Sequence, residues 1–379
     1  MNTNTARWLC LLTYSVLAAV TCSGVGSAAL GALLTAGVPI PDEAVAAILE
    51  EHHVPGVSIA VIHGGRIDWA KGYGVRESGK RDRVDTDTLF QAASISKPVS
   101  AAVALRMVAR NELALDEDVN GRLESWKVPE NEFTRNEPVT LRRLLSHSAG
   151  LSMHGVPEFA AGAEIPTLVQ ILNGEFAAAT EPVRLVAEPG SVHRYSGGGY
   201  IVLQLLLTDI AGEPFAPLAR ELVLQPAGMS SSTFEQPLPE RLRHKAAVGH
   251  HSDGTPIRGF WHTLPEQATG GLWTTPRDLA SFMIEVWRSY HGQSERLLPQ
   301  QLARLMLTRQ IEEFGLGFSL PSVGVARFQH GGGNAGYRCH TVLSVGAADG
   351  VVIMTNGDAG EQVIWELFEA IAQAYGWKA

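Results

Sequence analysis

Apolar residues follow two different patterns along this chain, which divide it into a strand-rich start, a helix-rich middle and a strand-rich end. Residues 57–62 are almost wholly apolar, which predicts a buried strand. Gly64 and Gly65 then predict a hairpin turn, with residues 66–75 as the returning strand. Residues 94–110 are apolar on every side, which is typical of a helix at the centre of a large fold.

The remaining apolar runs predict further helices in the middle of the chain and further strands near its end. Loops that contain Gly and Pro separate these runs. The predicted helices cover residues 41–51, 94–110, 141–145, 168–172, 200–210, 216–224, 276–290 and 361–377, and the predicted strands cover residues 57–62, 66–75, 88–92, 325–329, 337–345 and 350–355.

Strands at both chain ends predict an α/β (α+β) fold, with one mainly antiparallel sheet flanked by helices and a helical second lobe. We expect the α/β lobe to comprise residues 40–112 and 245–379, and the helical lobe to comprise residues 113–244. A functional site is expected between the two lobes.

Residues 1–29 are predicted to be a secretory signal peptide. Arg7 is their only charge, an apolar run covers residues 8–20, and small residues follow. We expect cleavage near Ala28 or Ala29 and a mature chain that is exported to the periplasm or secreted. The alternatives are lipid attachment at Cys22 and an uncleaved N-terminal membrane anchor.

The composition argues against several classes of function. The chain has 379 residues, 45% of them hydrophobic and 18% charged, which is ordinary for a globular protein. Its 39 acidic residues outnumber its 30 basic ones, whereas a nucleic-acid-binding protein usually carries a basic excess. Three cysteines are too few for a cysteine-type zinc cluster, and the irregular spacing of His250, His251, Asp253 and His262 favours a solvated loop. No metal or cofactor is therefore predicted.

The sharpest chemical signal is Ser94, which stands three residues before Lys97 at the start of a predicted helix. Positions three apart share a helix face, so Lys97 can lie beside the serine hydroxyl and act as its base. Burial would lower the pKa of that lysine, as a neutral base requires. The alternative is an N-cap serine followed by a solvated lysine.

Two glycine-rich segments strengthen the catalytic interpretation. Tyr195 precedes residues 197–199, all glycine, at a predicted loop-to-helix junction, where a tyrosine could share a proton with Ser94 and Lys97. His330 precedes three further glycines, which would let a substrate approach the backbone. The plainer interpretations are an aromatic residue packed on a glycine turn and a glycine-rich hairpin loop.

In this order, Ser-x-x-Lys, Tyr-Ser-x and His-Gly-Gly resemble the serine β-lactamase and penicillin-binding superfamily. The similarity is greater to its class C β-lactamase-like branch, which includes D,D-peptidases, D-aminopeptidases and family VIII esterases. It covers residue 40 to the C-terminus, including residues 144–151 and 270–279. The resemblance implies that Ser94 is the nucleophile and that Lys97 and Tyr195 shuttle its proton.

The resemblance also implies where the substrate binds. His330 and Gly332 would belong to the Lys/His-x-Gly strand motif, and the backbone N–H groups of Ser94 and Gly333 would form the oxyanion hole. Arg338 could supply a substrate-binding charge if it faces the cleft, although an ion pair within the protein is the favoured role for it. His154 is a further candidate for lining the site.

The chain departs from the family pattern at Gly197, where many relatives have an asparagine whose amide helps to place the lysine and the acyl-side carbonyl. We therefore expect an exported serine hydrolase that forms an acyl-serine on a β-lactam, a D-amino-acid peptide or a small ester. An esterase with little β-lactamase activity and a non-catalytic cell-wall or ligand-binding module are the alternatives. Gly197→Asn is expected to raise β-lactam turnover relative to ester turnover.

Overall fold

The computed structural model describes residues 34–135, 137–175 and 181–377. The predicted signal peptide lies outside the described residues. Within the described ranges no single helix is long and apolar enough to cross a bilayer. Helix α6 (Gly197–Ala211) and the segment Phe215–Leu224 are long and apolar enough only when they are taken together, and the chain bends by 85° between them.

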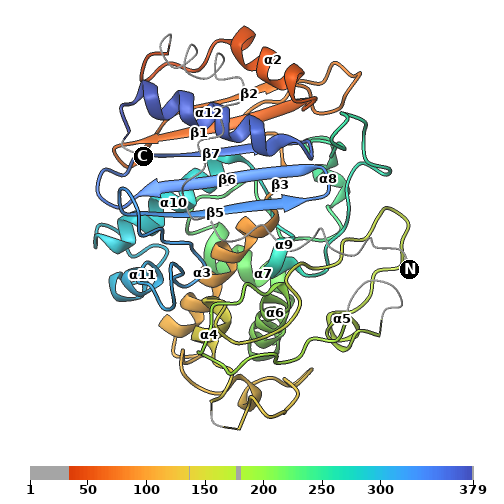
Figure 1. Ribbon diagram of the computed structural model, residues 1–379, viewed down its shortest axis with the longest axis vertical. Coiled ribbons are helices and arrows are strands. Elements are labelled where there is room, and N and C mark those ends of the chain that lie inside the picture. The colour runs from red at the N-terminus through yellow and green to blue at the C-terminus, as the bar shows by residue number, and fades with distance from the viewer. Residues whose placement is uncertain (1–33, 136, 176–180, 378–379) are drawn as a thin grey trace, which may run out of the picture.

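Strands from both ends of the chain pair into one antiparallel sheet, in the order β2-β1-β7-β6-β5 (Figure 1). Strand β1 lies between its hairpin partner β2 and the much later β7, which brings the two chain ends together. The sheet strands are β1 (Gly56–His63), β2 (Arg66–Gly74), β5 (Arg327–Asn334), β6 (Tyr337–Ser344) and β7 (Gly350–Thr355). This sheet, flanked by helices, confirms the predicted fold class.

Helices cover both faces of the sheet because its inner strands are apolar on both sides. In β1, all residues from Gly56 to Ile62 are buried. Helices α2 (Asp42–Glu51) and α12 (Gly360–Ala374) pack on one face, and α10 (Pro276–Tyr290) packs on the other. The predicted helices at both ends of the chain are confirmed.

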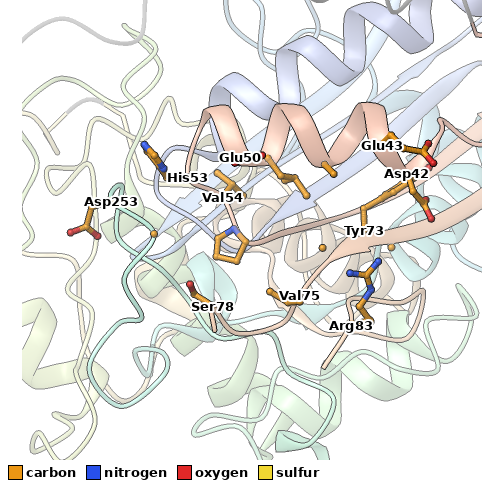
Figure 2. A pocket seen from close by; sticks show the side chains of 16 residues that line it. Asp42, Glu43, Glu50, His53, Val54, Tyr73, Val75, Ser78, Arg83 and Asp253 are labelled. Carbon is orange, nitrogen blue, oxygen red and sulfur yellow. The ribbon is translucent and has the colours of Figure 1, made fainter. Parts of the chain in front are cut away.

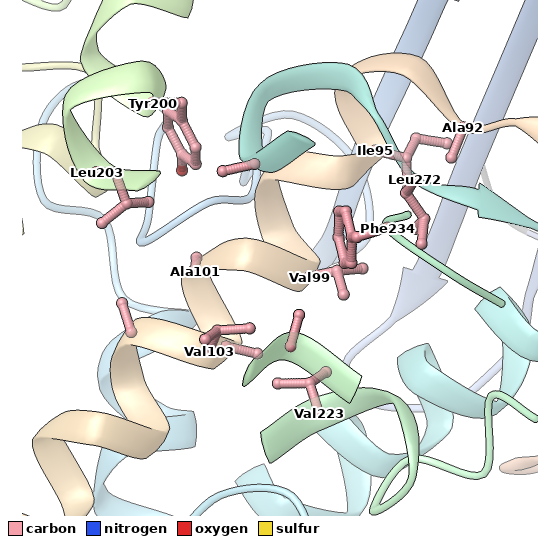
Figure 3. Close-up of a cluster of buried hydrophobic side chains, with 14 of the residues drawn as sticks. Ala92, Ile95, Val99, Ala101, Val103, Tyr200, Leu203, Val223, Phe234 and Leu272 are labelled. Atoms are coloured by element: carbon pink, nitrogen blue, oxygen red, sulfur yellow. The ribbon is translucent and has the colours of Figure 1, made fainter. Parts of the chain in front are cut away.

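A central helix, α3 (Ser96–Ala109), carries the candidate nucleophile segment at its N-terminus. A short 3₁₀ turn, Ala93–Ile95, leads directly into it. All α3 residues from Ser96 to Leu105 are buried, as their apolar character predicts. In Figure 3, Val99, Ala101 and Val103 of α3 lie among side chains from α6 and from later segments. This packing holds the start of α3 in a fixed position.

The helical part of the chain lies beyond the β5 edge of the sheet (Figure 1). It contains α4 (Leu141–Leu145), α5 (Leu168–Asn173), α6 and α7 (Phe215–Ala219), and the π-helical turn Arg220–Leu224 continues α7. Short elements that the apolar pattern did not predict are the 3₁₀ turn Val119–Gly121, α8 (Glu240–Arg243), α9 (Gln267–Gly270), α11 (Gln300–Met306) and β4 (Trp273–Thr274). The main hydrophobic core includes side chains from both predicted lobes.

Two strand boundaries differ from their predictions. The strand expected at residues 325–329 is β5, which continues through the glycines to Asn334, so His330 and Gly331–Gly333 lie in a strand and not in a hairpin loop. Pairing of every one of these residues with β6 outweighs the weak strand preference of glycine. The strand expected at residues 88–92 is reduced to β3 (Phe90–Gln91), which pairs with β4.

Candidate active site

Ser94 lies in a 3₁₀ turn whose preceding residue, Ala93, has a left-handed backbone with φ of +47°. Such a conformation is uncommon for a residue with a side chain and is often found at functional sites. From Thr88 to Leu105, Ser94 is the only residue that is not buried. The turn therefore exposes one hydroxyl from an otherwise buried segment.

Lys97 lies beside this hydroxyl, with its Nζ 3.1 Å from the Oγ of Ser94. The Nζ also donates a hydrogen bond to the backbone oxygen of Thr269 in α9, at 2.9 Å. Only 1% of the residue is exposed, and this burial lowers the pKa of Lys97 to about 7. A large share of Lys97 is therefore neutral near pH 7 and can accept a proton.

Tyr195 belongs to the helical part of the chain, two residues before α6, and lies beside the Ser94 hydroxyl. Its phenol is hydrogen-bonded to Ser94, and the Nζ of Lys97 lies 5.0 Å from its ring centroid. Burial raises the pKa of Tyr195 far above its usual value, so the phenol stays protonated at neutral pH. The fold thus brings together Ser94, Lys97 and Tyr195, the three residues predicted to be catalytic.

His147 and Ser196 fix the position of Tyr195. The His147 ring stacks on the Tyr195 ring with centroids 4.1 Å apart, and its Nδ1 accepts a hydrogen bond from the Ser196 N–H at 3.1 Å. Ser196 caps α6, because its Oγ accepts from the Gly199 N–H at 2.9 Å and donates to the Ser152 oxygen at 2.7 Å. This hydrogen bond and the ring stacking give His147 a structural role.

His330 enters the site from β5 as a neutral side chain. Its ring centroid lies 6.4 Å from that of Tyr195. Because a carbonyl oxygen only accepts, the 2.6 Å contact with the Gly331 oxygen places the ring proton on Nδ1. Burial and the Lys97 charge lower the pKa of His330 to about 3. His330, at the Lys/His position of the motif, therefore carries no positive charge at neutral pH.

The β5 backbone turns the Gly333 N–H toward the open edge of the sheet. On that edge, Gln329 exchanges two 3.0 Å backbone hydrogen bonds with Ser319. Because backbone direction in a strand repeats every two residues, the N–H groups of Gly331 and Gly333 point to the same edge as that of Gln329. At Gly332 an added Cβ would lie 2.5 Å from the Ala92 oxygen and 3.0 Å from the Ser94 nitrogen. Only glycine lets β5 approach the nucleophile turn this closely.

Arg338 has its charge partner within the protein. Its Nη2 lies 3.1 Å from a carboxylate oxygen of Asp358, and its Nη1 donates to the backbone oxygens of Asn334 and Tyr337, each at 2.7 Å. The guanidinium packs beside Gly333, where an added Cβ would lie 3.4 Å from the Nη1. These contacts agree with the ion-pair role that the sequence favoured for Arg338.

A β-lactamase family model matches residues 41–375. The chain belongs to the β-lactamase family. It is a serine hydrolase of this family, and its relatives include the penicillin-binding proteins and esterases named from the resemblance.

Three similarities illustrate the range of proteins related to this β-lactamase-family chain. Penicillin-binding protein 4 of Amycolatopsis lactamdurans is 27% identical over 86% of this chain and 87% of its own length. Esterase EstB of Burkholderia gladioli is 33% identical over 58% of this chain and 57% of its own length. The fold is similar to that of D-amino acid amidase from Ochrobactrum anthropi SV3, with a TM-score of 0.69 and 21% identity over 88% of this chain and 98% of that structure.

The residues that hold the catalytic groups in place were not predicted from the sequence of this β-lactamase-family chain. The Asn334 Nδ2 donates to the Gln91 Oε1 at 2.7 Å and to the Gly270 oxygen at 3.2 Å. The Gln91 Nε2 in turn donates to the His262 oxygen at 2.8 Å. Thr269, Gln91 and Asn334 are far apart in sequence and belong to no common motif, although Asn334 directly follows the glycines of β5.

A groove of about 600 Å³ lies at the opposite edge of the sheet from these catalytic residues. It runs between α2 and β2, with Glu43 and Glu50 on the helix side and Arg83 on the other (Figure 2). Among the described residues, no group of three or more His, Cys, Asp or Glu side chains is arranged to hold a metal ion. Cys339 is buried, and burial raises the pKa of its thiol.

Proposed function

We propose that this chain hydrolyses uncharged esters through an acyl-serine at Ser94, more readily than it hydrolyses penicillins. The observation that carries the proposal is the 3.1 Å contact between Ser94 and a Lys97 whose burial favours the neutral amine. A solvated lysine would be protonated at neutral pH and could not accept the serine proton. This contact also argues against a binding module that only retains the fold, which would have no use for a neutral buried lysine.

In the acylation step, the Ser94 oxygen attacks the ester carbonyl while its proton moves to Lys97. The negative charge that develops on the carbonyl oxygen is stabilised by the N–H groups of Ser94 and Gly333. When the carbonyl re-forms, the bond to the alkoxide breaks, and a proton from the Lys97 ammonium reaches the departing alkoxide by way of Tyr195. Water then attacks the acyl-serine by the same proton path, which releases the acid and restores the serine.

The preference for uncharged substrates rests on the charges near β5. His330 is neutral, and Arg338 is paired with Asp358. Neither residue presents a free positive charge to a substrate carboxylate of the kind that penicillins carry.

We also propose that the protein is exported, either as a cleaved chain or by lipid attachment at Cys22. The order of charge, apolar run and small residues before residue 30 supports export.

Covalent labelling tests the proposed nucleophile. A fluorophosphonate probe should add one equivalent of mass to the wild type and to Ser96→Ala, and none to Ser94→Ala. Ser96 is the matched control, because its buried Oγ accepts the Leu272 N–H at 3.0 Å and faces the protein interior. Labelling that persists in Ser94→Ala would refute the assignment, and faster turnover of benzylpenicillin than of nitrophenyl butyrate would refute the substrate preference.

A further inference from the structure

The space beside Gly197 is filled by the chain itself. A Cβ added at Gly197 would lie 2.8 Å from the Cγ1 of Val156 and 3.0 Å from the backbone oxygen of His154. Two backbone hydrogen bonds hold this segment against the start of α6, from the Gly197 N–H to the His154 oxygen at 3.0 Å and from the Gly198 N–H to the Met153 oxygen at 3.1 Å. An asparagine at position 197 therefore cannot be accommodated unless residues 153–156 move.

The same segment presents the His154 side chain next to the catalytic groups. Its ring centroid lies 5.0 Å from that of Tyr195, and the residue remains accessible to solvent although its ring is partly covered. Met153, just before it, has φ of +62°, a backbone conformation that residues with side chains rarely adopt. In the described part of the chain, no hydrogen bond or ion pair engages the His154 ring. Its nitrogens are thus free for a partner from outside these residues.

The His154 ring is neutral at neutral pH, because partial burial and the nearby charges of Lys97 and Arg194 lower its pKa. A neutral imidazole has one N–H donor and one bare nitrogen acceptor. It can therefore donate a hydrogen bond to a carbonyl oxygen, as a side-chain amide does.

We propose that His154 determines substrate specificity by hydrogen-bonding a polar group on the acyl side of the ester, such as an acylamino group close to the reacting carbonyl. This inference rests on the proposed ester hydrolysis at Ser94. The histidine segment occupies the space into which a side chain at residue 197 would project, so His154 does from a loop what the family's asparagine does from the helix start. The preferred substrates are then acylamino esters and not simple alkyl esters.

Two nitrophenyl esters with the same leaving group test this inference, nitrophenyl butyrate and the nitrophenyl ester of N-acetyl-alanine, the latter in both configurations. His154→Ala should lower kcat/KM for the better acetylalanine ester by about tenfold and leave that for butyrate within about twofold, as expected for one lost hydrogen bond. His154→Asn, which keeps a side-chain N–H donor, should recover most of the loss. His244→Ala is the matched control, since His244 is an exposed histidine at the end of α8, and it should change neither rate.

The outcomes separate this inference from the function on which it rests. An active wild type whose ratio of the two rates is unchanged in His154→Ala would overturn the role of His154 and leave the ester hydrolase intact. A fall in kcat/KM by the same factor for both esters would also overturn it. His154 would then affect the reaction that both esters share and not the recognition of the acylamino group. A wild type that hydrolyses neither ester would overturn the proposed function, and this inference with it.

Discussion

The amide of Asn334 donates a 2.7 Å hydrogen bond to the side-chain oxygen of Gln91, and both side chains are buried. Asn334 ends β5, which carries the proposed oxyanion glycine, and Gln91 ends β3, three residues before the nucleophile. Asn334 also reaches the Gly270 oxygen, next to the Thr269 oxygen that holds Lys97. One buried amide thus connects the segments that position the oxyanion hole, the nucleophile and its base.

Asn334→Leu is therefore expected to lower kcat by about tenfold to a hundredfold with little change in KM, because a small misplacement of the reacting groups slows the chemical step. It should also lower the free energy of unfolding by about 1–3 kcal/mol, since the Gln91 amide loses a buried partner. Ester kinetics and urea unfolding measure the two effects.

The matched test is a double-mutant cycle with Gln91→Leu. The two losses in free energy of unfolding should be less than additive, with a coupling of about 1 kcal/mol. Each single variant leaves one buried amide without its partner, whereas the double variant leaves neither. Fully additive losses would contradict the proposed link.

The pH dependence of kcat/KM should follow Lys97. The pKa of Lys97 is lowered to about 7, and the neutral amine is the active form, so kcat/KM should rise with pH through about 7 and level off above about 8. His330 does not contribute to this rise, because its pKa is lowered to about 3 and it is neutral throughout. A profile that is flat between pH 6 and 9 would show that another group is the base.

Lys97→Arg is the control for this profile. An arginine remains protonated at all these pH values, so the variant should be inactive even though the positive charge is kept. Activity in Lys97→Arg would mean that the lysine contributes its charge and not a free electron pair.

Gly197 and Gly199 provide a matched pair for the crowding at the start of α6. A Cβ at Gly197 would contact Val156 at 2.8 Å, whereas at Gly199 the nearest atom would lie at 3.6 Å. Gly197→Ala should therefore lower the free energy of unfolding by about 1–3 kcal/mol, as overpacking does. Gly199→Ala should raise it by about 0.4–1 kcal/mol, because alanine restricts the unfolded chain.

Urea unfolding measures the free energy of unfolding of both variants. Equal values would show that residues 153–156 can move aside without loss of stability. The same contact changes the sequence-based expectation for Gly197→Asn. We expect that variant to lose turnover of the acetylalanine ester through displacement of His154, with no gain in β-lactam turnover.

Export predicts a mature N-terminus near Leu30. N-terminal sequencing of protein purified from the periplasm or medium of an expressing bacterium should find it. An intact Met1 on active protein would contradict cleavage, and a lipidated Cys22 at the N-terminus would select the anchored form.

The sequence by itself determined the sheet-and-helix architecture and the identity of the main catalytic candidates. Strand and helix periodicities are local properties, so residues 57–62 and 276–290 could be assigned without knowledge of their partners. The Ser94 and Lys97 pair could be predicted for the same reason, because one helical turn fixes their spacing whatever surrounds them.

Only the tertiary structure decided the protonation states and the supporting contacts. The pKa of Lys97 depends on burial beneath α6 and α9, and the neutrality of His330 depends on burial and on the Lys97 charge. The apolar pattern ended this strand at residue 329, because the pairing with β6 that continues β5 through its glycines to Asn334 is not visible in local propensity. The contacts of Asn334 with Gln91 and of His154 with Tyr195 join residues distant in the chain, and only the packing of the whole fold brings them together.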